Sequence, residues 1–218
     1  MAIIELKNVD KAYNGIQLFK SVNLKINQGK IYRFIGPNGS GKTVLFKMIC
    51  GFVFPDEGLI YVNGKELDKR KNRFPKNIGL IIDRPGFIGN LTGFDNLKHL
   101  ALIKNKITDK EIMTTMELVG LQPEAKQKVK NYSQGMKQKL AFAQAIMEDQ
   151  DILVLDEPFN AMDEDSVANT RNILKNFKEK GKTILLTSHN REDINFLCDE
   201  VYKINGSQLE LDNSKSIS

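Results

Sequence analysis

One segment of the chain has the residue types needed to surround phosphate groups. Residues 36–43 read Gly-Pro-Asn-Gly-Ser-Gly-Lys-Thr and match the pattern G-x-x-x-x-G-K-[ST]. Glycines permit a tight turn whose backbone N–H groups point inward at phosphate oxygens. Lys42 can reach the β- and γ-phosphates of a nucleotide, and the Thr43 hydroxyl can coordinate Mg²⁺. We therefore expect this loop to bind a nucleoside triphosphate through Gly36, Pro37, Asn38, Gly39, Ser40, Gly41, Lys42 and Thr43.

Two acids at the end of an apolar run form a second candidate site. Residues 152–155 read Ile-Leu-Val-Leu and are followed by Asp156 and Glu157. A buried strand that ends in this way places both acids at the carboxyl edge of a parallel sheet, where α/β folds bind ligands. Asp156 would hold Mg²⁺ through water, and Glu157 would orient or deprotonate the water that attacks the γ-phosphate. The alternative is a helix whose first turn happens to be acidic, and the phosphate loop argues against it.

A third segment combines a helix-capping residue with a glycine. Residues 131–140 read Asn-Tyr-Ser-Gln-Gly-Met-Lys-Gln-Lys-Leu. Ser133 is placed as an N-cap with Gly135 inside the first helical turn, which leaves N–H donors available at the helix start. Such a helix end can bind an anion. Because residues 36–43 already surround the phosphates, a second anion site is useful if it binds the nucleotide of another copy.

The elements that position these segments follow from apolar patterns and turn signals. Alternating apolar residues predict strands around residues 3–9, 16–26 and 30–35, and a further strand at 59–62. The dipeptides Asn14-Gly15, Gln28-Gly29 and Asn63-Gly64 are the turns that separate or follow these strands. A helix is expected to begin after Gly41, so that its positive dipole end faces the phosphates.

Helical character returns between about residues 93 and 150. Thr92 with Asp95, and Thr108 with Glu111, have the spacing of a helix-capping box. The second of these helices has apolar residues on one face and a glycine stop, namely Ile112, Met116, Val119 and Gly120. We expect residues 87–150 to form a helical lobe.

The last third of the chain predicts a parallel sheet. Residues 152–155 and 183–186 are short apolar runs, and a helix of about 16 residues, ending near Lys180-Gly181, lies between them. Strand, helix and strand in this order indicate an α/β sheet. We therefore expect one domain over residues 1–218, with an α/β core from residues 1–86 and 151–218 that carries the lobe.

Composition excludes several classes of protein. The 218 residues are 41% hydrophobic and 27% charged, which is not the composition of a collagen-like or disordered chain. The longest stretch without Asp, Glu, Lys or Arg is ten residues, 85–94. A membrane-spanning helix needs about 20 apolar residues, so we expect no span. No secretory signal is visible, and two cysteines, Cys50 and Cys198, fit a reducing compartment. These features favour a cytosolic protein.

The net charge of +5 leaves the partner open. A basic excess is compatible with nucleic acid, acidic lipid headgroups or a phosphorylated ligand, and also with solubility alone. The densest basic cluster, residues 69–73, is short and contains no aromatic residue, so a solvated loop is its simplest interpretation.

Taken together, these motifs resemble the nucleotide-binding subunits of ABC transporters along nearly the whole chain. The family's signature L-S-G-G-Q is Tyr-Ser-Gln-Gly-Met at residues 132–136, which keeps the Ser and the second Gly. Tyr13 stands where an aromatic residue of the family stacks on adenine. Residues 160–163, Asn-Ala-Met-Asp, match the loop that crosses the dimer interface, and His189 matches a histidine that senses the γ-phosphate.

The resemblance implies a fold, a reaction and partners. The fold is that of a P-loop NTPase, a RecA-like core with an N-terminal antiparallel β subdomain and an inserted helical lobe. The reaction is ATP hydrolysis with Mg²⁺, in which Lys42, Glu157 and His189 are catalytic. Two such chains, identical or sister chains, pair around two ATP molecules, and Ser133, Gln134 and Gly135 of one chain contact the ATP of the other. Separate membrane permease subunits would hold the pair at the inner face of the cell membrane.

One position departs from the family pattern. A Gln usually begins the loop between core and lobe and contacts Mg²⁺ and the attacking water, whereas this chain has Asp83. An added negative charge near a polyanion must be offset, and we expect Asp83 to lie at the metal. A carboxylate here, together with the sequences at 85–92 and 132–138, resembles the bacitracin-resistance and lantibiotic-immunity branch, which exports peptide antibiotics.

Two other classes remain as alternatives. A soluble ABC-type ATPase acting on nucleic acid or ribosomes would use the basic surface, and such proteins commonly carry tandem cassettes, a coiled coil or a zinc module, none of which the sequence shows. Salt-dependent RNA or DNA binding would support it. A non-hydrolysing regulator would need damaged catalytic residues, whereas Lys42, Asp156, Glu157 and His189 are all present.

Lys42→Ala is expected to lose nucleotide affinity, because the variant lacks the ammonium group that reaches the β- and γ-phosphates. Binding of a fluorescent ATP analogue to the purified chain measures this loss, with circular dichroism as the check on folding. Affinity equal to that of the unmodified chain would argue against phosphate binding by residues 36–43.

Overall fold

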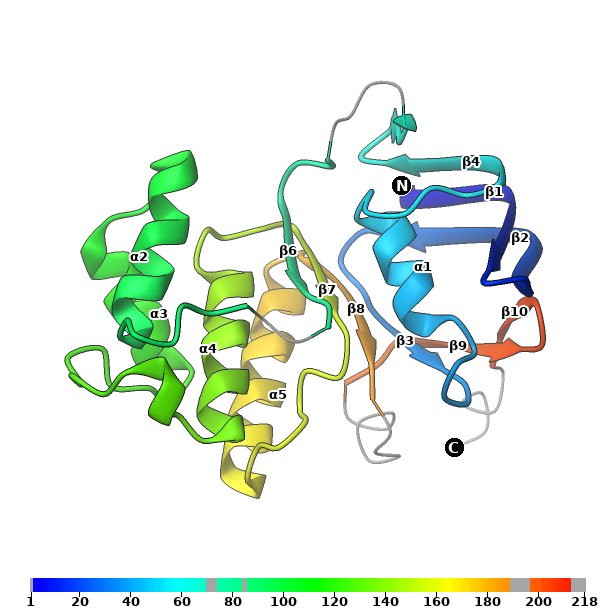
Figure 1. Cartoon of the computed structure of the whole chain (residues 1–218). Helices are drawn as coiled ribbons and strands as arrows, with labels where there is room; N and C mark the ends of the chain where they lie inside the picture. Colours follow the sequence, from blue (N-terminus) through cyan, green and yellow to red (C-terminus); the bar gives the residue numbers. More distant parts are fainter. Residues whose placement is uncertain (1, 70–73, 84–85, 189–196, 213–218) are drawn as a thin grey trace.

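The strands of this computed structural model, which describes residues 2–69, 74–83, 86–188 and 197–212, form two sheets (Figure 1). The first sheet is antiparallel and has the order β2-β1-β4-β5. Its strands are β1 (Ala2–Tyr13), β2 (Ile16–Asn27), β4 (Glu57–Val62) and β5 (Lys65–Glu66). The second sheet has the order β10-β9-β3-β8-β7-β6. Its strands are β3 (Ile31–Ile35), β6 (Ile78–Ile81), β7 (Ile152–Leu155), β8 (Thr183–Thr187), β9 (Glu200–Asn205) and β10 (Gln208–Leu211).

The predicted turns of the antiparallel sheet are confirmed. Asn14 and Gly15 have φ values of 49° and 78°, and Asn63 and Gly64 have φ values of 51° and 70°. Positive φ at both central residues is what a two-residue hairpin turn requires, because it matches the twist of the strands on either side. The first hairpin joins β1 to β2 and places Tyr13 at its tip, so β1 is longer than the predicted strand at residues 3–9.

The second sheet brings together the ends of strands that lie far apart in the sequence. Strands β9, β3, β8, β7 and β6 are parallel, and only β10 at the edge is antiparallel. In the register Leu155 of β7 lies beside Leu186 of β8, and Phe34 of β3 lies beside Thr187. The residues that follow β3, β7 and β8 therefore meet at one edge of the sheet.

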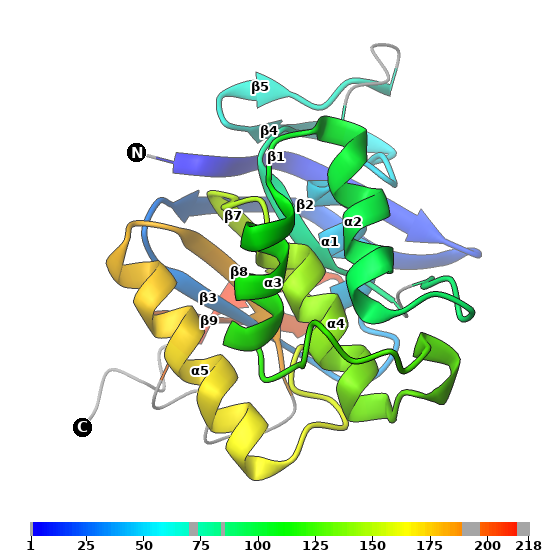
Figure 2. The same ribbon diagram turned by 90° about the vertical axis from the view of Figure 1, so that its left-hand side faces the viewer.

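The side chains of β7 alternate between two apolar clusters on opposite faces of the sheet. Ile152 and Val154 pack in a cluster with α1 (Lys42–Ile49) and the antiparallel sheet. Leu153 and Leu155 pack in a second cluster with α4 (Gln134–Ile146) and α5 (Glu164–Glu179). Figure 2 shows α4 and α5 in front of the parallel sheet, with α2 and α3 further out. Every residue of β7 is buried, which explains why its sequence is a continuous apolar run.

Both predicted capping boxes form in the segment 87–150. Thr92 caps α2 (Gly93–Lys104), and its side chain accepts a hydrogen bond from the Asp95 N–H at 3.1 Å. Thr108 caps α3 (Asp109–Leu118) in the same way through Glu111, and Gly120 ends that segment with a φ of 74°. A short 3₁₀ helix, η2 (Val129–Asn131), precedes α4.

Helix α4 belongs to the lobe and to the core at once. The cluster that contains Leu153 and Leu155 also contains Leu97 of α2, Met116 of α3 and Leu140 of α4, so apolar contact runs without interruption from the lobe to the sheet. The predicted helix between the two apolar runs is also confirmed, because α5 has 16 residues and ends beside Lys180 and Gly181. Within the described part of the chain, no helix has the length and apolar character needed to cross a membrane.

Helix α4 packs directly against the backbone of β6 at Gly79. A Cβ atom added to Gly79 would lie 1.8 Å from the Ala145 backbone carbonyl oxygen of α4. Only glycine therefore fits at this position. We expect Gly79→Ala to destabilise the protein by about 1–3 kcal/mol, the usual cost of overpacking, and thermal unfolding measures the loss. Gly86→Ala is the matched control, because no heavy atom lies within 4 Å of its added Cβ. An equal melting temperature for the two variants would contradict this account.

Candidate active site

The phosphate loop lies between β3 and α1 and is held by the packing of both. Phe46 of α1 meets Phe34 of β3 edge to face, with 5.5 Å between ring centroids. The loop glycines are required by space and by backbone conformation. A Cβ on Gly36 would lie 2.7 Å from the Ser40 hydroxyl oxygen, and Gly41 has a φ of 100° with the Phe19 ring 3.0 Å from its added Cβ.

Lys42 is the first residue of α1 and folds over its own loop. Its ammonium group donates hydrogen bonds to the carbonyl oxygens of Gly36 and Pro37, at 2.7 and 3.0 Å. These contacts keep the positive charge beside the loop, and the first turn of α1 contains no acidic side chain. The helix dipole and the lysine therefore act in the same direction, toward an anion.

A chain of hydrogen bonds joins the phosphate loop to the two acids after β7. The Thr43 hydroxyl donates to Oδ2 of Asp156 at 2.6 Å. The Thr187 hydroxyl donates to Oδ1 of Asp156 at 2.7 Å and accepts a hydrogen bond from the Glu157 N–H at 2.8 Å. Both Asp156 oxygens are thus engaged by hydroxyl groups, one from the helix after the loop and one from the end of β8.

One cavity unites most of the predicted nucleotide-binding residues. It has a volume of about 500 Å³, and Tyr13 at the hairpin tip lines it together with Asp156 and Glu157. The loop residues that line it are Asn38, Gly39, Ser40, Gly41, Lys42 and Thr43. Tyr13 is 52% exposed, so its ring face is accessible to a planar base. The arrangement suits a nucleotide whose base lies at Tyr13 and whose phosphates lie at the loop.

The residues at the start of α4 lie apart from this cavity. Ser133 caps α4 as predicted, and its hydroxyl oxygen accepts a hydrogen bond from the Met136 N–H at 3.1 Å. Ser133 and Gln134 are exposed, and Gly135 is packed so closely against Ala161 that an added Cβ would lie 2.7 Å from the Ala161 carbonyl oxygen. The first turn of α4 has no acidic side chain, like that of α1, whereas α2, α3 and α5 each begin with one.

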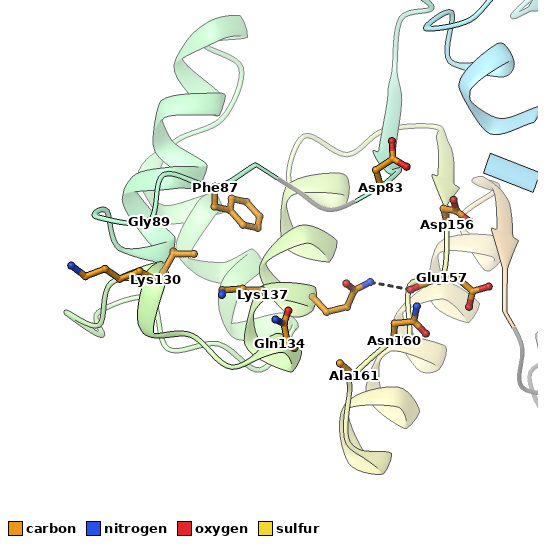
Figure 3. Close-up of a pocket in the computed structure, with 12 residues that line it drawn as sticks. Asp83, Phe87, Gly89, Lys130, Gln134, Lys137, Asp156, Glu157, Asn160 and Ala161 are labelled. Carbon is orange, nitrogen blue, oxygen red and sulfur yellow. Dashed lines mark hydrogen bonds between the residues drawn. The ribbon is translucent and has the colours of Figure 1, made fainter. Parts of the chain in front are cut away.

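A second cavity of about 810 Å³ adjoins the first at the acidic pair. Asp156 and Glu157 line both cavities, and Figure 3 shows them facing residues of the lobe across the second one. On the lobe side the lining includes Phe87, Gln134 and Lys137. The cavity therefore connects the catalytic candidates to the start of α4.

Asp83 lines the second cavity, but its carboxylate contacts a lysine. The Lys47 ammonium group of α1 lies 2.6 Å from Oδ2 of Asp83, and Asp83 has a positive φ of 58°. One carboxylate oxygen of Asp83 is thus paired with a lysine, and its role at the metal stays a prediction. The contact also supplies the charge that offsets an acid so close to a polyanion site.

Two other predictions concern the segment 160–163 and His189. In the segment 160–163, Ala161 has a φ of 59° and Asp163 is the N-cap of α5. Hydrogen bonds from the Ser166 hydroxyl and N–H lower the pKa of the Asp163 carboxyl group. His189 lies outside the described residues.

The oxygen atoms at Thr43 and Asp156 fit Mg²⁺. Magnesium favours hard oxygen ligands and is usually held by one or two carboxylates together with substrate phosphates and water. The Thr43 hydroxyl and the Asp156 carboxylate are in direct contact beside the phosphate loop. Among the described residues no group of three or more His, Cys, Asp or Glu could hold a metal by itself, so phosphate oxygens would complete the coordination.

Three neighbours of the site were not predicted from the sequence. Lys47 pairs with Asp83, Thr187 joins Asp156 to Glu157, and Gln138 donates to the Glu157 carbonyl oxygen at 3.0 Å. A hydroxyl residue directly after the apolar run of β8 was a visible signal for Thr187. Gln138 and Lys47 had no such signal, because they lie within helices.

Fold and site together define a P-loop nucleoside triphosphatase with an inserted helical lobe. A family profile described as ABC transporter matches residues 19–160. The chain belongs to the ABC transporter family, and it is the ATP-binding, ATP-hydrolysing subunit. The predicted fold class is confirmed.

Individual relatives support this assignment. The chain is 41% identical to the uncharacterized ABC transporter ATP-binding protein YybJ of Bacillus subtilis (strain 168). The 208 aligned residues cover 95% of each protein. It is 35% identical to the bacitracin transport ATP-binding protein BcrA of Enterococcus faecalis, over 91% of this chain and 65% of that protein. It is 34% identical to the lantibiotic transport ATP-binding protein SrtF of Streptococcus pyogenes, over 90% of this chain and 84% of that protein. The predicted resemblance to the bacitracin and lantibiotic branch is confirmed.

A solved structure supports the assignment of the fold. The dimeric structure of a bacterial ABC transporter cassette superposes with a TM-score of 0.85 at 26% identity, covering 95% of this chain and 96% of that one.

The Lys47–Asp83 contact generates a prediction for ATP binding. Lys47→Met leaves the Asp83 carboxylate uncompensated beside the phosphates, so we expect KM for ATP to rise by up to about fivefold at low salt, the range of an exposed ion pair. Adding Asp83→Asn should remove most of this effect, and increasing ionic strength should reduce it. Steady-state ATPase assays of the four variants of the cycle measure it.

Lys98→Met is the matched control, because Lys98 pairs with Asp109 at the same distance, 2.6 Å, on the lobe. An equal rise in KM for Lys47→Met with and without Asp83→Asn would show that the charge of Asp83 is not involved.

Proposed function

We propose that two copies of this chain, or this chain and a sister chain, pair head to tail around two molecules of ATP. Each ATP would lie between residues 36–43 of one copy and Ser133, Gln134 and Gly135 of the other. ATP then joins the two copies, and hydrolysis separates them. The observation that carries this proposal is the separation of two anion-attracting helix starts, because α1 opens into the nucleotide cavity and α4 begins outside it.

The lining of the first cavity supports a proposed role for each residue. Tyr13 would stack on adenine, and the loop N–H groups with Lys42 would bind the β- and γ-phosphates. Thr43 and Asp156 would hold Mg²⁺, which neutralises the charge that develops on the phosphates during transfer. Asp83, which lines the adjoining cavity with Asp156, would be a further ligand of the metal.

Glu157 is proposed as the residue that prepares water for attack. It comes two residues after the end of β7, and it lines the cavity that the phosphate loop lines. A carboxylate at this position accepts a proton from the water, or orients it, as the γ-phosphoryl group is transferred. His189, which follows the end of β8 by two positions in the sequence, is proposed to contact the γ-phosphate.

The pair would act on separate permease subunits and sit at the inner face of the cell membrane. Support comes from the ABC transporter family itself and from relatives named as transport ATP-binding proteins. Movement of the lobe against the core would transmit the change at the nucleotide to the permease.

The proposed cargo is a peptide antibiotic, which the transporter would export. The names of two relatives, which concern bacitracin and lantibiotic transport, support this class of cargo. These two names give no support to the alternative in which the chain acts on nucleic acid.

Glu157→Gln tests the proposed pair and the proposed role of Glu157 together. The variant should bind ATP with nearly unchanged affinity, lose turnover by roughly 100-fold or more, and accumulate as a dimer in ATP. Size-exclusion chromatography with light scattering, with and without Mg-ATP, measures the association.

Glu164→Gln is the control, because Glu164 is an exposed acid in the first turn of α5. Full ATPase activity in Glu157→Gln would overturn the role of Glu157. A variant that is inactive and monomeric in saturating ATP would overturn the ATP-joined pair.

A further inference from the structure

The backbone of Glu157 adopts a conformation that few residues tolerate. Its φ is 50°, in the left-handed region, although it has a full side chain. This conformation costs roughly 1–2 kcal/mol for an L-residue, because Cβ approaches the following carbonyl oxygen. Such strain persists at functional sites only where the surrounding structure holds it.

A side chain from β8 holds the peptide N–H on the N-terminal side of the Glu157 Cα. The Glu157 N–H donates to the Thr187 hydroxyl oxygen at 2.8 Å, and the same hydroxyl donates to Oδ1 of Asp156 at 2.7 Å. Thr187 is completely buried at the end of its strand. One hydroxyl therefore ties the backbone of Glu157 to the carboxylate of Asp156, using both its donor and its acceptor capacity.

A side chain from α4 holds the carbonyl side. Nε2 of Gln138 donates to the Glu157 carbonyl oxygen at 3.0 Å and to the Pro158 carbonyl oxygen at 3.1 Å, and Figure 3 draws the first of these contacts. The Asn160 N–H, at 3.3 Å, also reaches the Glu157 carbonyl oxygen. Side chains from two different elements thus hold the two peptide groups on either side of the Glu157 Cα.

We propose that Thr187 and Gln138 are positioning residues that hold the left-handed backbone of Glu157 and so direct its carboxylate into the nucleotide cavity. The proposal rests on the proposed role of Glu157 in hydrolysis. Thr187 acts on Glu157 and Asp156 together, whereas Gln138 acts on the Glu157 segment alone. Loss of either contact lets the backbone relax toward an unstrained φ, and a displacement of about 1 Å of a catalytic group costs on the order of 100-fold in rate.

The two contacts predict different kinetic effects. Gln138→Met keeps the size of the side chain but removes the donor, so kcat should fall roughly 10- to 100-fold with KM for ATP unchanged. Thr187→Val removes the hydroxyl and leaves Asp156 with one partner fewer, so kcat should fall and the Mg²⁺ concentration needed for half-maximal rate should rise. Thr187→Ser restores the hydroxyl and should recover most of both parameters.

The experiment measures kcat, KM for ATP, Mg²⁺ dependence and melting temperature for the full chain and these variants. Gln144→Met is the matched control, because Gln144 lies on the same helix, two turns beyond Gln138. The substitutions are also made in the Glu157→Gln background, where Gln138→Met should cause no further loss if it acts through Glu157. A purely structural role would instead lower the melting temperature and leave kcat of the folded protein unchanged.

The outcomes separate this proposal from the proposed function. Full turnover in Glu157→Gln overturns the role of Glu157, and the positioning role falls with it. An inactive Glu157→Gln combined with unchanged kcat in Gln138→Met and Thr187→Val overturns only the positioning role. If Thr187→Val does not fold, Gln138→Met and Thr187→Ser decide, because Gln138 is only partly buried and Thr187→Ser keeps the hydrogen bonds.

Discussion

The hydrogen bonds of Asp156 are the interaction on which the whole site depends. Thr43 reaches this carboxylate from the helix after the phosphate loop, and Thr187 reaches it from the neighbouring strand. These contacts are possible because β3, β8 and β7 are adjacent and parallel, so that three loops distant in the sequence leave the sheet at the same edge. The order of the strands, more than any single motif, assembles the catalytic candidates.

The helices proposed to bind phosphate differ from the other helices in the charge of their first turn. The helices α2, α3 and α5 begin with a capping side chain and an acid in the first turn, which satisfies their own N–H groups and dipole. By contrast, α1 has no capping side chain, and neither α1 nor α4 has an acid in its first turn. An external anion would be more favourable at these two ends, which agrees with the proposal that they meet phosphates.

Much of the fold could be predicted from the sequence because its signals are local. The Asn14-Gly15 turn, the capping boxes at Thr92 and Thr108 and the buried runs of β7 and β8 each depend on a few adjacent residues. Lys47 and Gln138 had no such local signal, and Thr187 had one that did not reveal its partners. Thr187 meets Asp156 across 31 positions in the sequence, and a contact of that kind exists only after the strands have paired. For the same reason the ion pair between Asp83 and a lysine of α1 could not be predicted from the sequence.

The apolar cluster shared by lobe and core has a consequence for unfolding. A lobe with its own core would open separately and exchange its amide hydrogens at a lower free energy than the sheet. Here Leu97 and Met116 of the lobe belong to the same buried cluster as Leu153 and Leu155 of the sheet, with α4 between them. The chain is therefore expected to melt as one cooperative unit, and a cavity made at Met116 would weaken the protection of the strand that carries the catalytic acids.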